Sequence, residues 1–292
     1  MAASAQSGSG NTAFVLAGGG SLGAVQVGML KALADHPVEP AFVVGSSVGA
    51  INGAFFAAEP TSEGVARLER IWRGLQRRDI FPITPLLSLL GFLRRNNFLV
   101  DPSNLRDLLE RNLPFRRLEE THIPFHLVAT DAIEGGSVRV SSGPAIDALM
   151  ASAAIPAVFP PVPLGKRFLM DGAVTSNAPI SAAVELGATR LVVLPTGLPC
   201  SIQKPPSGVI AMALHALNLL IHRQLVLELE RLEEGIQLAV VPPLCPLETS
   251  TYDFSHPGEL IDRAEESTRH WLAEDGLEAG GVPATLQPHA HG

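Results

Sequence analysis

The chain has 292 residues, which is enough for one α/β domain with a deep interior. Hydrophobic residues make up 46% and charged residues 17%, which excludes a disordered body, and the net charge of −8 argues against the basic face of a nucleic-acid binder. Two cysteines are too few for a dense disulfide framework, so we expect a reducing, cytoplasmic location.

The chain opens with a polar segment, residues 1–11, which lacks the basic start and apolar core of a secretory signal. Two strand–turn–helix units follow. They are a strand at 14–16, glycines at 18–20 and a helix at 24–34, then a strand at 41–44, a turn at 45–49 and a helix at 50–58. Two such units in succession predict parallel strands.

The rest of the chain continues this alternation. Further strands are expected at 125–130, 136–140, 167–170, 190–195 and 236–241, with helices at 103–111, 144–153, 178–187 and 208–234 and a closing helix from Pro257 to Leu272. The pattern predicts a three-layer α/β/α fold around a central, mostly parallel sheet. We expect one domain, residues 12–275, between flexible tails at 1–11 and 276–292, and no transmembrane helix.

The segment 45–49, Gly-Ser-Ser-Val-Gly, has the Gly-x-Ser-x-Gly spacing of a nucleophile elbow. Such a turn exposes the serine hydroxyl, here that of Ser47, and needs Gly45 and Gly49 because larger residues would collide. Ser47 is therefore the candidate nucleophile. The alternative is that Ser46 or Ser47 merely caps the following helix, and the motif alone does not decide between the two.

The glycine run 18–20, followed by Gly23, is the second candidate element. Glycines before a helix let main-chain N–H groups point into a cavity at the positive end of the helix dipole, where they can hold an oxyanion. The run also fits a dinucleotide-binding fingerprint. That fingerprint needs an acidic residue at the far end of the second strand, whereas Asp35 and Glu39 precede it, so nucleotide binding is the weaker alternative.

Asp171 is the candidate proton acceptor, although its Asp-Gly pair is, in isolation, a hairpin-turn signal. A nucleophilic serine needs a base, and the histidines offer no convincing one. His122 and His126 are separated by Pro124, so they do not share a helical face. His215 and His222 fall in an expected helix, and His289 and His291 lie in the tail. A Ser47–Asp171 dyad therefore fits best, and it predicts no rate inflection near the histidine pKa of about 6.5.

Together these segments resemble the patatin-like phospholipases, or lipid acyl hydrolases. That family combines a glycine-rich oxyanion loop, a Gly-x-Ser-x-Gly elbow and a later Asp-Gly-Ala or Asp-Gly-Gly, and all three occur here in that order. The likeness continues through 151–161, Ala-Ser-Ala-Ala-Ile-Pro-Ala-Val-Phe-Pro-Pro, and covers roughly residues 12–200. The resemblance implies a patatin-like fold without cofactor or metal, nucleophile Ser47, general base Asp171 and oxyanion donors Gly18, Gly19 and Gly20.

The implied activity is hydrolysis of a carboxylic ester, from a lipid or a smaller molecule, through an acyl-enzyme. Acyl transfer to an alcohol or amine would use the same residues and stays open. Many relatives carry Arg or Lys where this chain has Leu22, which lowers the expectation of an anionic phospholipid substrate. The apolar segment 80–99 could form a lid or a peripheral membrane contact, but we favour simple packing because such runs are usually buried.

Overall fold

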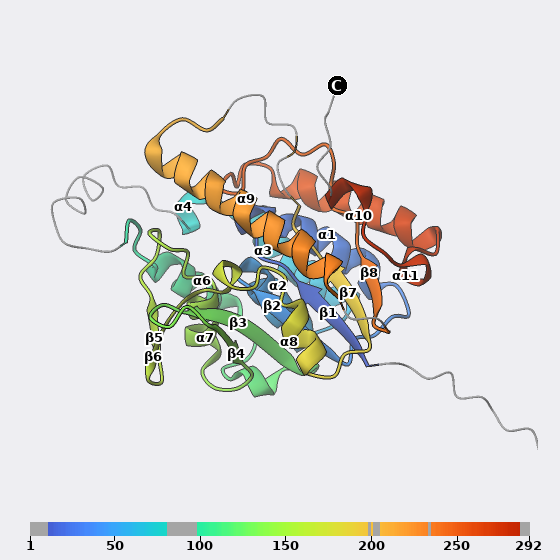
Figure 1. Ribbon diagram of the computed structural model, residues 1–292, viewed down its shortest axis with the longest axis horizontal. Coiled ribbons are helices and arrows are strands. Elements are labelled where there is room, and N and C mark those ends of the chain that lie inside the picture. Colours follow the sequence, from blue (N-terminus) through green and yellow to red (C-terminus); the bar gives the residue numbers. More distant parts are fainter. Residues whose placement is uncertain (1–10, 81–97, 198–199, 201–204, 233–234, 287–292) are drawn as a thin grey trace, which may run out of the picture.

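The computed structural model describes residues 11–80, 98–197, 200, 205–232 and 235–286. Within these residues eight strands form one sheet in the order β5-β6-β3-β2-β1-β7-β8, with β4 paired to β3 off this path (Figure 1). The strands are β1 (Thr12–Leu16), β2 (Phe42–Ser46), β3 (Phe125–Asp131), β4 (Ser137–Val140), β5 (Val162–Leu164), β6 (Arg167–Asp171), β7 (Arg190–Leu194) and β8 (Gln237–Val240).

The α-helices of the described residues surround this sheet. They are α1 (Gly23–Ala34), α2 (Val48–Ala58), α3 (Ser62–Gly74), α4 (Arg77–Ile80), α6 (Ser103–Asn112), α7 (Ala145–Ser152), α8 (Ile180–Glu185), α9 (Val209–Glu230), α10 (Pro257–Ala273) and α11 (Gly276–Ala279). Short 3₁₀ turns are η1 (Gly20–Leu22), η2 (Leu118–Glu120), η3 (Gly172–Val174) and η4 (Ala284–Leu286).

The centre of the sheet is parallel and one side is antiparallel. β1 pairs in parallel with β2 and β7, β2 pairs in parallel with β3, and β7 with β8, whereas β6 runs antiparallel to β3 and β5. β1 and β2 are buried along their whole length, as expected for parallel strands covered on both faces. The antiparallel β6 carries the chain back beside β3, and β3 lies between β6 and β2.

Helices cover both faces of the sheet (Figure 1). The side chains of β1 point alternately into two cores, one on each face. Phe14 and Leu16 belong to a large core with side chains of α1, α2, α3, α6, α7 and α10. Ala13 and Val15 point the other way, into a core with α8 and α9. The expected three-layer α/β/α fold with a mostly parallel sheet is therefore confirmed.

The expected strands and helices of the described residues are present with small shifts at their ends, but α3, α4, α11 and β5 were not anticipated. The signal for α3 was available. Thr61 caps the helix by accepting from the Gly64 N–H at 3.1 Å, and the buried Val65, Leu68 and Trp72 recur at helical spacing.

Part of the expected C-terminal tail packs against the domain. Leu277 and Leu286 are buried, and the Gly281 N–H donates to the carbonyl of Leu238 in β8 at 2.8 Å. Residues 1–10 and 287–292 lie outside the described residues, as do 81–97, which are most of the segment 80–99 that could form a lid or pack in the core. The domain bounds 12–275 stay a prediction. None of the described helices combines the length and the apolarity needed to cross a membrane.

Candidate active site

Ser47 lies at the sharp turn between β2 and α2, where its backbone adopts φ 53° and ψ −126°. A positive φ at a residue other than glycine is strained and is typical of a nucleophile elbow. The flanking glycines are required by close backbone contacts. A Cβ on Gly45 would lie 2.4 Å from the Gly49 carbonyl oxygen, and a Cβ on Gly49 would lie 2.3 Å from that of Leu16.

The helix-capping alternative is wrong for both serines. Ser47 stands at the N-cap position of α2, but its side chain makes no capping hydrogen bond. The Ser46 hydroxyl is buried and has no hydrogen-bond partner among the described residues. The Ser47 hydroxyl is directed elsewhere, toward the carboxylate that ends β6.

Asp171 accepts a hydrogen bond from the Ser47 hydroxyl. Ser47 Oγ donates to Asp171 Oδ2 at 2.6 Å, and the Ala173 N–H donates to the other carboxylate oxygen at 2.8 Å. Both dyad side chains are buried, with 6% and 4% exposure. After Asp171 the chain enters the 3₁₀ turn η3, so the hairpin expected as an alternative at this Asp-Gly pair does not form. The structure thus brings together two residues 124 positions apart.

Burial raises the pKa of Asp171 to about 6, while hydrogen bonds from the Ser47 hydroxyl and the Ala173 N–H oppose that rise. Above that pH the carboxylate is mostly ionised and can accept a proton. Tyr252, in the same cavity, has its pKa raised to about 12 by burial and by the charge of Asp171. A pKa of about 6 means that Asp171 itself would give a rate inflection close to that pH, so such an inflection would not by itself indicate a catalytic histidine. The expectation that no imidazole takes part stays a prediction.

The glycine run 18–20 packs directly against the dyad and its neighbours. A Cβ on Gly18 would meet Ser47 Cβ at 3.1 Å, one on Gly19 would meet Thr196 Oγ1 at 2.0 Å, and one on Gly20 would meet the Thr251 carbonyl oxygen at 2.3 Å. Gly20 also has a positive φ of 59°, which favours glycine. The loop could not follow this path with larger residues.

The three loop amides differ in what they already bind. The Gly18 N–H donates to the Asn177 carbonyl at 3.0 Å and is therefore occupied. The amides of Gly19 and Gly20 make no hydrogen bond within the described part of the chain. The set of three candidate oxyanion donors thus narrows to these two.

Ser152 holds the elbow in place, although nothing in the sequence singled it out for that role. Its hydroxyl accepts from the Ser47 N–H at 2.9 Å and donates to the Val128 carbonyl at 2.7 Å. The residue lies within 151–161, the segment noted for its family likeness, and that likeness was the one available signal. The hydroxyl ties the strained turn to strand β3.

A second buried polar group fixes both ends of the glycine loop. Gln26 Nε2 donates to the carbonyl of Ala17, which precedes the loop, at 2.7 Å. Asn52 Nδ2 donates to the carbonyl of Gly23, which follows it, at 2.9 Å, and to Gln26 Oε1 at 3.0 Å. Trp72 Nε1 completes the group by donating to Asn52 Oδ1 at 2.9 Å. Gln26 and Asn52 are fully buried. In the sequence, the available signal was that each is a polar residue within an apolar helical segment.

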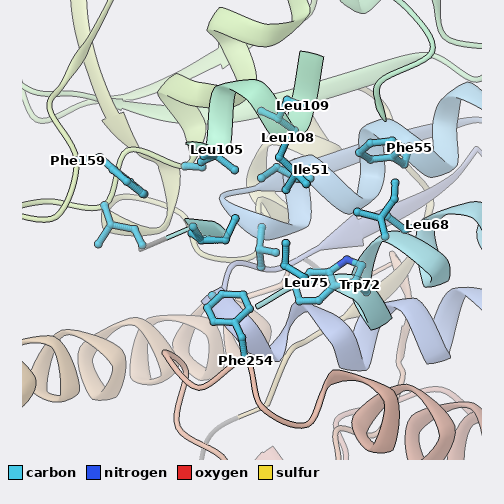
Figure 2. A pocket seen from close by; sticks show the side chains of 16 residues that line it. Ile51, Phe55, Leu68, Trp72, Leu75, Leu105, Leu108, Leu109, Phe159 and Phe254 are labelled. Atoms are coloured by element: carbon cyan, nitrogen blue, oxygen red, sulfur yellow. The ribbon is translucent and has the colours of Figure 1, made fainter. Parts of the chain in front are cut away.

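The larger of two cavities beside the dyad is apolar and spans about 690 Å³ of empty space. It begins at Gly20 and Val48, the neighbour of Ser47, and extends between α2, α3 and α6. Figure 2 shows its larger side chains converging on a common space: Ile51, Phe55, Leu68, Trp72, Leu75, Leu105, Leu108, Leu109, Phe159 and Phe254. A chain of methylene groups would find only apolar partners here.

The smaller cavity spans about 430 Å³ and contains Asp171. Polar groups line it together with apolar side chains of α9, and Gly20 and Ile155 line both cavities. Asp171 is the one charged residue among the described lining residues of the two cavities, and no histidine is among them. Leu22, where many relatives carry a cation, is fully buried in the core.

No group of three His, Cys, Asp or Glu within the described ranges is arranged to hold a metal ion. Two histidines were considered as bases, and their contacts lie elsewhere. His126 Nδ1 lies 2.7 Å from the hydroxyl of Ser141, and His222 Nε2 lies 3.2 Å from the carbonyl of Leu286. Neither contact involves a residue of the dyad.

The chain is similar to known proteins of one family. The sequence model of the patatin-like phospholipase family matches residues 14–184, more than half of the chain. Patatin-like phospholipase domain-containing protein 7 of Rattus norvegicus is 28% identical over 195 residues, which are 63% of this chain and 13% of that protein. An uncharacterized NTE family protein of Mycobacterium tuberculosis is 31% identical over 176 residues, which are 60% of this chain and 46% of that protein.

The chain therefore spans less than half the length of these relatives. Solved structures are more distant. VipD from Legionella pneumophila matches with a TM-score of 0.49 and 15% identity, over 92% of this chain and 67% of that one.

Proposed function

Because the chain belongs to the patatin-like phospholipase family, we propose that it is a lipid acyl hydrolase that cleaves carboxylic esters with Ser47 and Asp171. One observation carries the proposal: the 2.6 Å hydrogen bond from Ser47 Oγ to the buried Asp171 carboxylate. A serine hydroxyl is a weak nucleophile until an adjacent base accepts its proton. Asp171 is the residue in position to do so.

In the proposed reaction, Asp171 takes the Ser47 proton as Oγ attacks the ester carbonyl carbon. The N–H groups of Gly19 and Gly20 stabilise the negative charge on the carbonyl oxygen of the tetrahedral intermediate. The protonated Asp171 then gives its proton to the leaving alcohol, and an acyl-Ser47 ester remains. In the second half, Asp171 accepts a proton from water as the water oxygen attacks the acyl carbon. The bond from that carbon to Ser47 Oγ then breaks, Asp171 returns the proton to Oγ, and the acid is released.

We assign the acyl chain to the apolar cavity beyond Val48 and the alcohol portion to the smaller cavity around Asp171. Apolar walls favour a hydrocarbon chain by about 0.8 kcal/mol for each methylene group that is buried. The described walls carry no cation to pair with a phosphate group. This supports an uncharged alcohol portion over an anionic headgroup.

The test compares Ser47→Ala with Ser46→Ala, a neighbouring buried serine whose hydroxyl has no hydrogen-bond partner among the described residues. The substrates are aryl esters of graded acyl length and a phospholipid. We expect Ser47→Ala to lose at least about 1000-fold in kcat/KM and Ser46→Ala to stay near wild type. Full activity of Ser47→Ala would refute the proposal.

A phosphonate ester probe supplies an independent readout, because it should label wild type once, at Ser47, as seen by intact mass and peptide mapping. Labelling of Ser46→Ala but not of Ser47→Ala is expected. Product analysis with an added alcohol as competing acceptor separates hydrolysis from acyl transfer, the alternative that uses the same residues.

A further inference from the structure

Helix α9 presents an exposed apolar stripe to the outside of the molecule. Met212, Leu219 and Leu220 are 42%, 45% and 68% exposed. The exposed Ala213 and Ala216 lie on the same side, since positions 212, 213, 216, 219 and 220 share one helical face. In Figure 1 α9 lies in front as an outer element on its side of the molecule. We call these five residues the α9 stripe.

The opposite face of the same helix forms a wall of the active site. Leu217, Asn218 and Ile221 line the smaller cavity together with Asp171. Asn218 Nδ2 donates to Thr251 Oγ1 at 2.6 Å, which ties the helix to the loop that also contacts the glycine run. The width of α9 therefore separates the exterior stripe from the space where the alcohol portion of the substrate would lie.

The two halves of α9 are held differently. In the second half Leu225, Val226 and Leu229 are buried, and Gln224 Nε2 donates to the Thr175 carbonyl. From Ala211 to Ile221, in contrast, no side chain is buried. The second half therefore anchors the helix, and the first half lies on the surface over the cavity.

The charge pattern distinguishes this surface from ordinary solvated helix. No charged residue occurs between positions 209 and 222, and the exposed Arg223 ends the stripe. Exposed surface helices usually carry polar residues on the outer face, and a contiguous apolar face marks contact with another apolar phase. The overall charge of −8 opposes attraction to an anionic membrane, so neutral or zwitterionic lipid fits better.

We propose that the α9 stripe is the surface with which the protein lies on a zwitterionic or neutral lipid aggregate. The helix lies in the plane of the interface with Leu219 and Leu220 inserted, as interfacial helices do. The inference rests on the proposed function, because the lipid phase is then both the support and the source of substrate. The inner face of α9 lines the cavity that contains Asp171, so this one helix lies between the lipid phase and the site.

The experiment measures partitioning onto phosphatidylcholine vesicles by flotation, with Ser47→Ala as the background so that no lipid is consumed. Leu220→Gln is compared with Ile133→Gln, a matched control because Ile133 is 78% exposed on the turn after β3. We expect Leu220→Gln to weaken partitioning about tenfold or more and Ile133→Gln to leave it unchanged. Thermal unfolding of both variants checks that the fold is intact.

Three results would overturn the proposal: unchanged partitioning of Leu220→Gln, equal losses in both variants, or light scattering that shows a dimer which Leu220→Gln dissociates. The last would assign the stripe to a second copy of this chain. Failure of the proposed function is seen separately, as absent turnover of a short water-soluble ester by wild type. Vesicle binding that depends on Leu220 would then still establish the surface.

Discussion

The turn around Ser47 is packed backbone against backbone, whereas the apolar cavity beyond Val48 is walled by side chains. At Gly45 and Gly49 an added Cβ would strike main-chain atoms, which cannot rotate away. In the cavity, apolar side chains from α2, α3 and α6 face one another, and one can replace another with modest repacking. The packed half of the site, the turn around Ser47, therefore requires particular residues at particular positions. The apolar half, the cavity beyond Val48, requires only that its side chains be apolar.

Among the substitutions that test this contrast, Gly19→Ala should give the largest effect, and it tests the closely packed glycine loop that adjoins the turn. The new Cβ would lie 2.0 Å from Thr196 Oγ1 and 2.6 Å from Thr196 Cβ, so rotation of the threonine side chain does not remove the clash and the loop must shift. The amide that we propose as an oxyanion donor moves with it. Loss of one such donor typically costs about 100- to 1000-fold in rate. We expect a fall of that size in kcat/KM of ester hydrolysis.

The matched control for Gly19→Ala is Gly74→Ala, at the end of α3. A Cβ there would meet nothing within 4 Å, so activity and folding should be retained. Wild-type activity in Gly19→Ala would show that the loop amides do not stabilise the reaction and that the glycines serve packing alone.

The pH profile tests the electrostatics of the packed half. Asp171 must be ionised to accept the Ser47 proton, and burial raises its pKa to about 6. Well below that pH the ionised fraction falls tenfold per unit, so kcat/KM for an uncharged ester should fall about 50-fold between pH 6 and pH 4 and level off above about pH 7.

A histidine base would give a similar profile, and two variants separate the cases. His126→Gln and His222→Gln remove imidazoles that contact no residue of the dyad, so both should keep the inflection near pH 6. Loss of the inflection in either variant would restore a triad.

The packed half was predictable because steric contact restricts residue type. Glycine at 45 and 49 leaves a pattern that can be recognised without coordinates, since no other residue fits the turn. The two apolar strands before the glycine-rich turns were found for a related reason, because buried parallel strands leave continuous apolar runs. The order of these motifs then indicated the dyad.

The walls of the apolar cavity could not be predicted in the same way. Apolarity is shared by the core and the cavity, so a sequence pattern cannot say which leucines face empty space. Helix α3, which contributes Leu68 and Trp72, was missed although its spacing was legible. The hydrogen bond of the Gly18 amide could not be predicted from the sequence either, because its partner is a main-chain carbonyl, which every residue type supplies. The raised pKa of Asp171 depends on burial that only the fold creates.

Ser152→Ala asks how far the strained turn depends on side-chain support. The substitution leaves the buried Ser47 N–H and the Val128 carbonyl without their shared partner, at a cost of about 1–3 kcal/mol in unfolding free energy. We expect kcat/KM to fall about tenfold because the hydroxyl of Ser47 is less well held. Chemical denaturation and ester hydrolysis measure the two effects.

Ser176→Ala is the control for Ser152→Ala. Its hydroxyl is also buried, but its hydrogen bond is a long 3.4 Å contact to a carbonyl two residues away. Equal loss of activity in both variants would mean that the elbow responds to general destabilisation and not to the bond with Ser152.

The smallest effect is expected from Ile51→Phe, which tests the tolerance of the apolar half. Ile51 lies one turn beyond Val48 on α2 and faces the cavity in Figure 2, so the larger ring removes space for the acyl chain. Because each buried methylene contributes about 0.8 kcal/mol, losing room for one or two should lower kcat/KM for dodecanoate esters several-fold. Butyrate esters should be turned over as before. Ile133→Phe, made at an exposed site, should leave the chain-length preference unchanged. If Ile51→Phe lowers kcat/KM equally for every ester, this cavity does not hold the acyl chain.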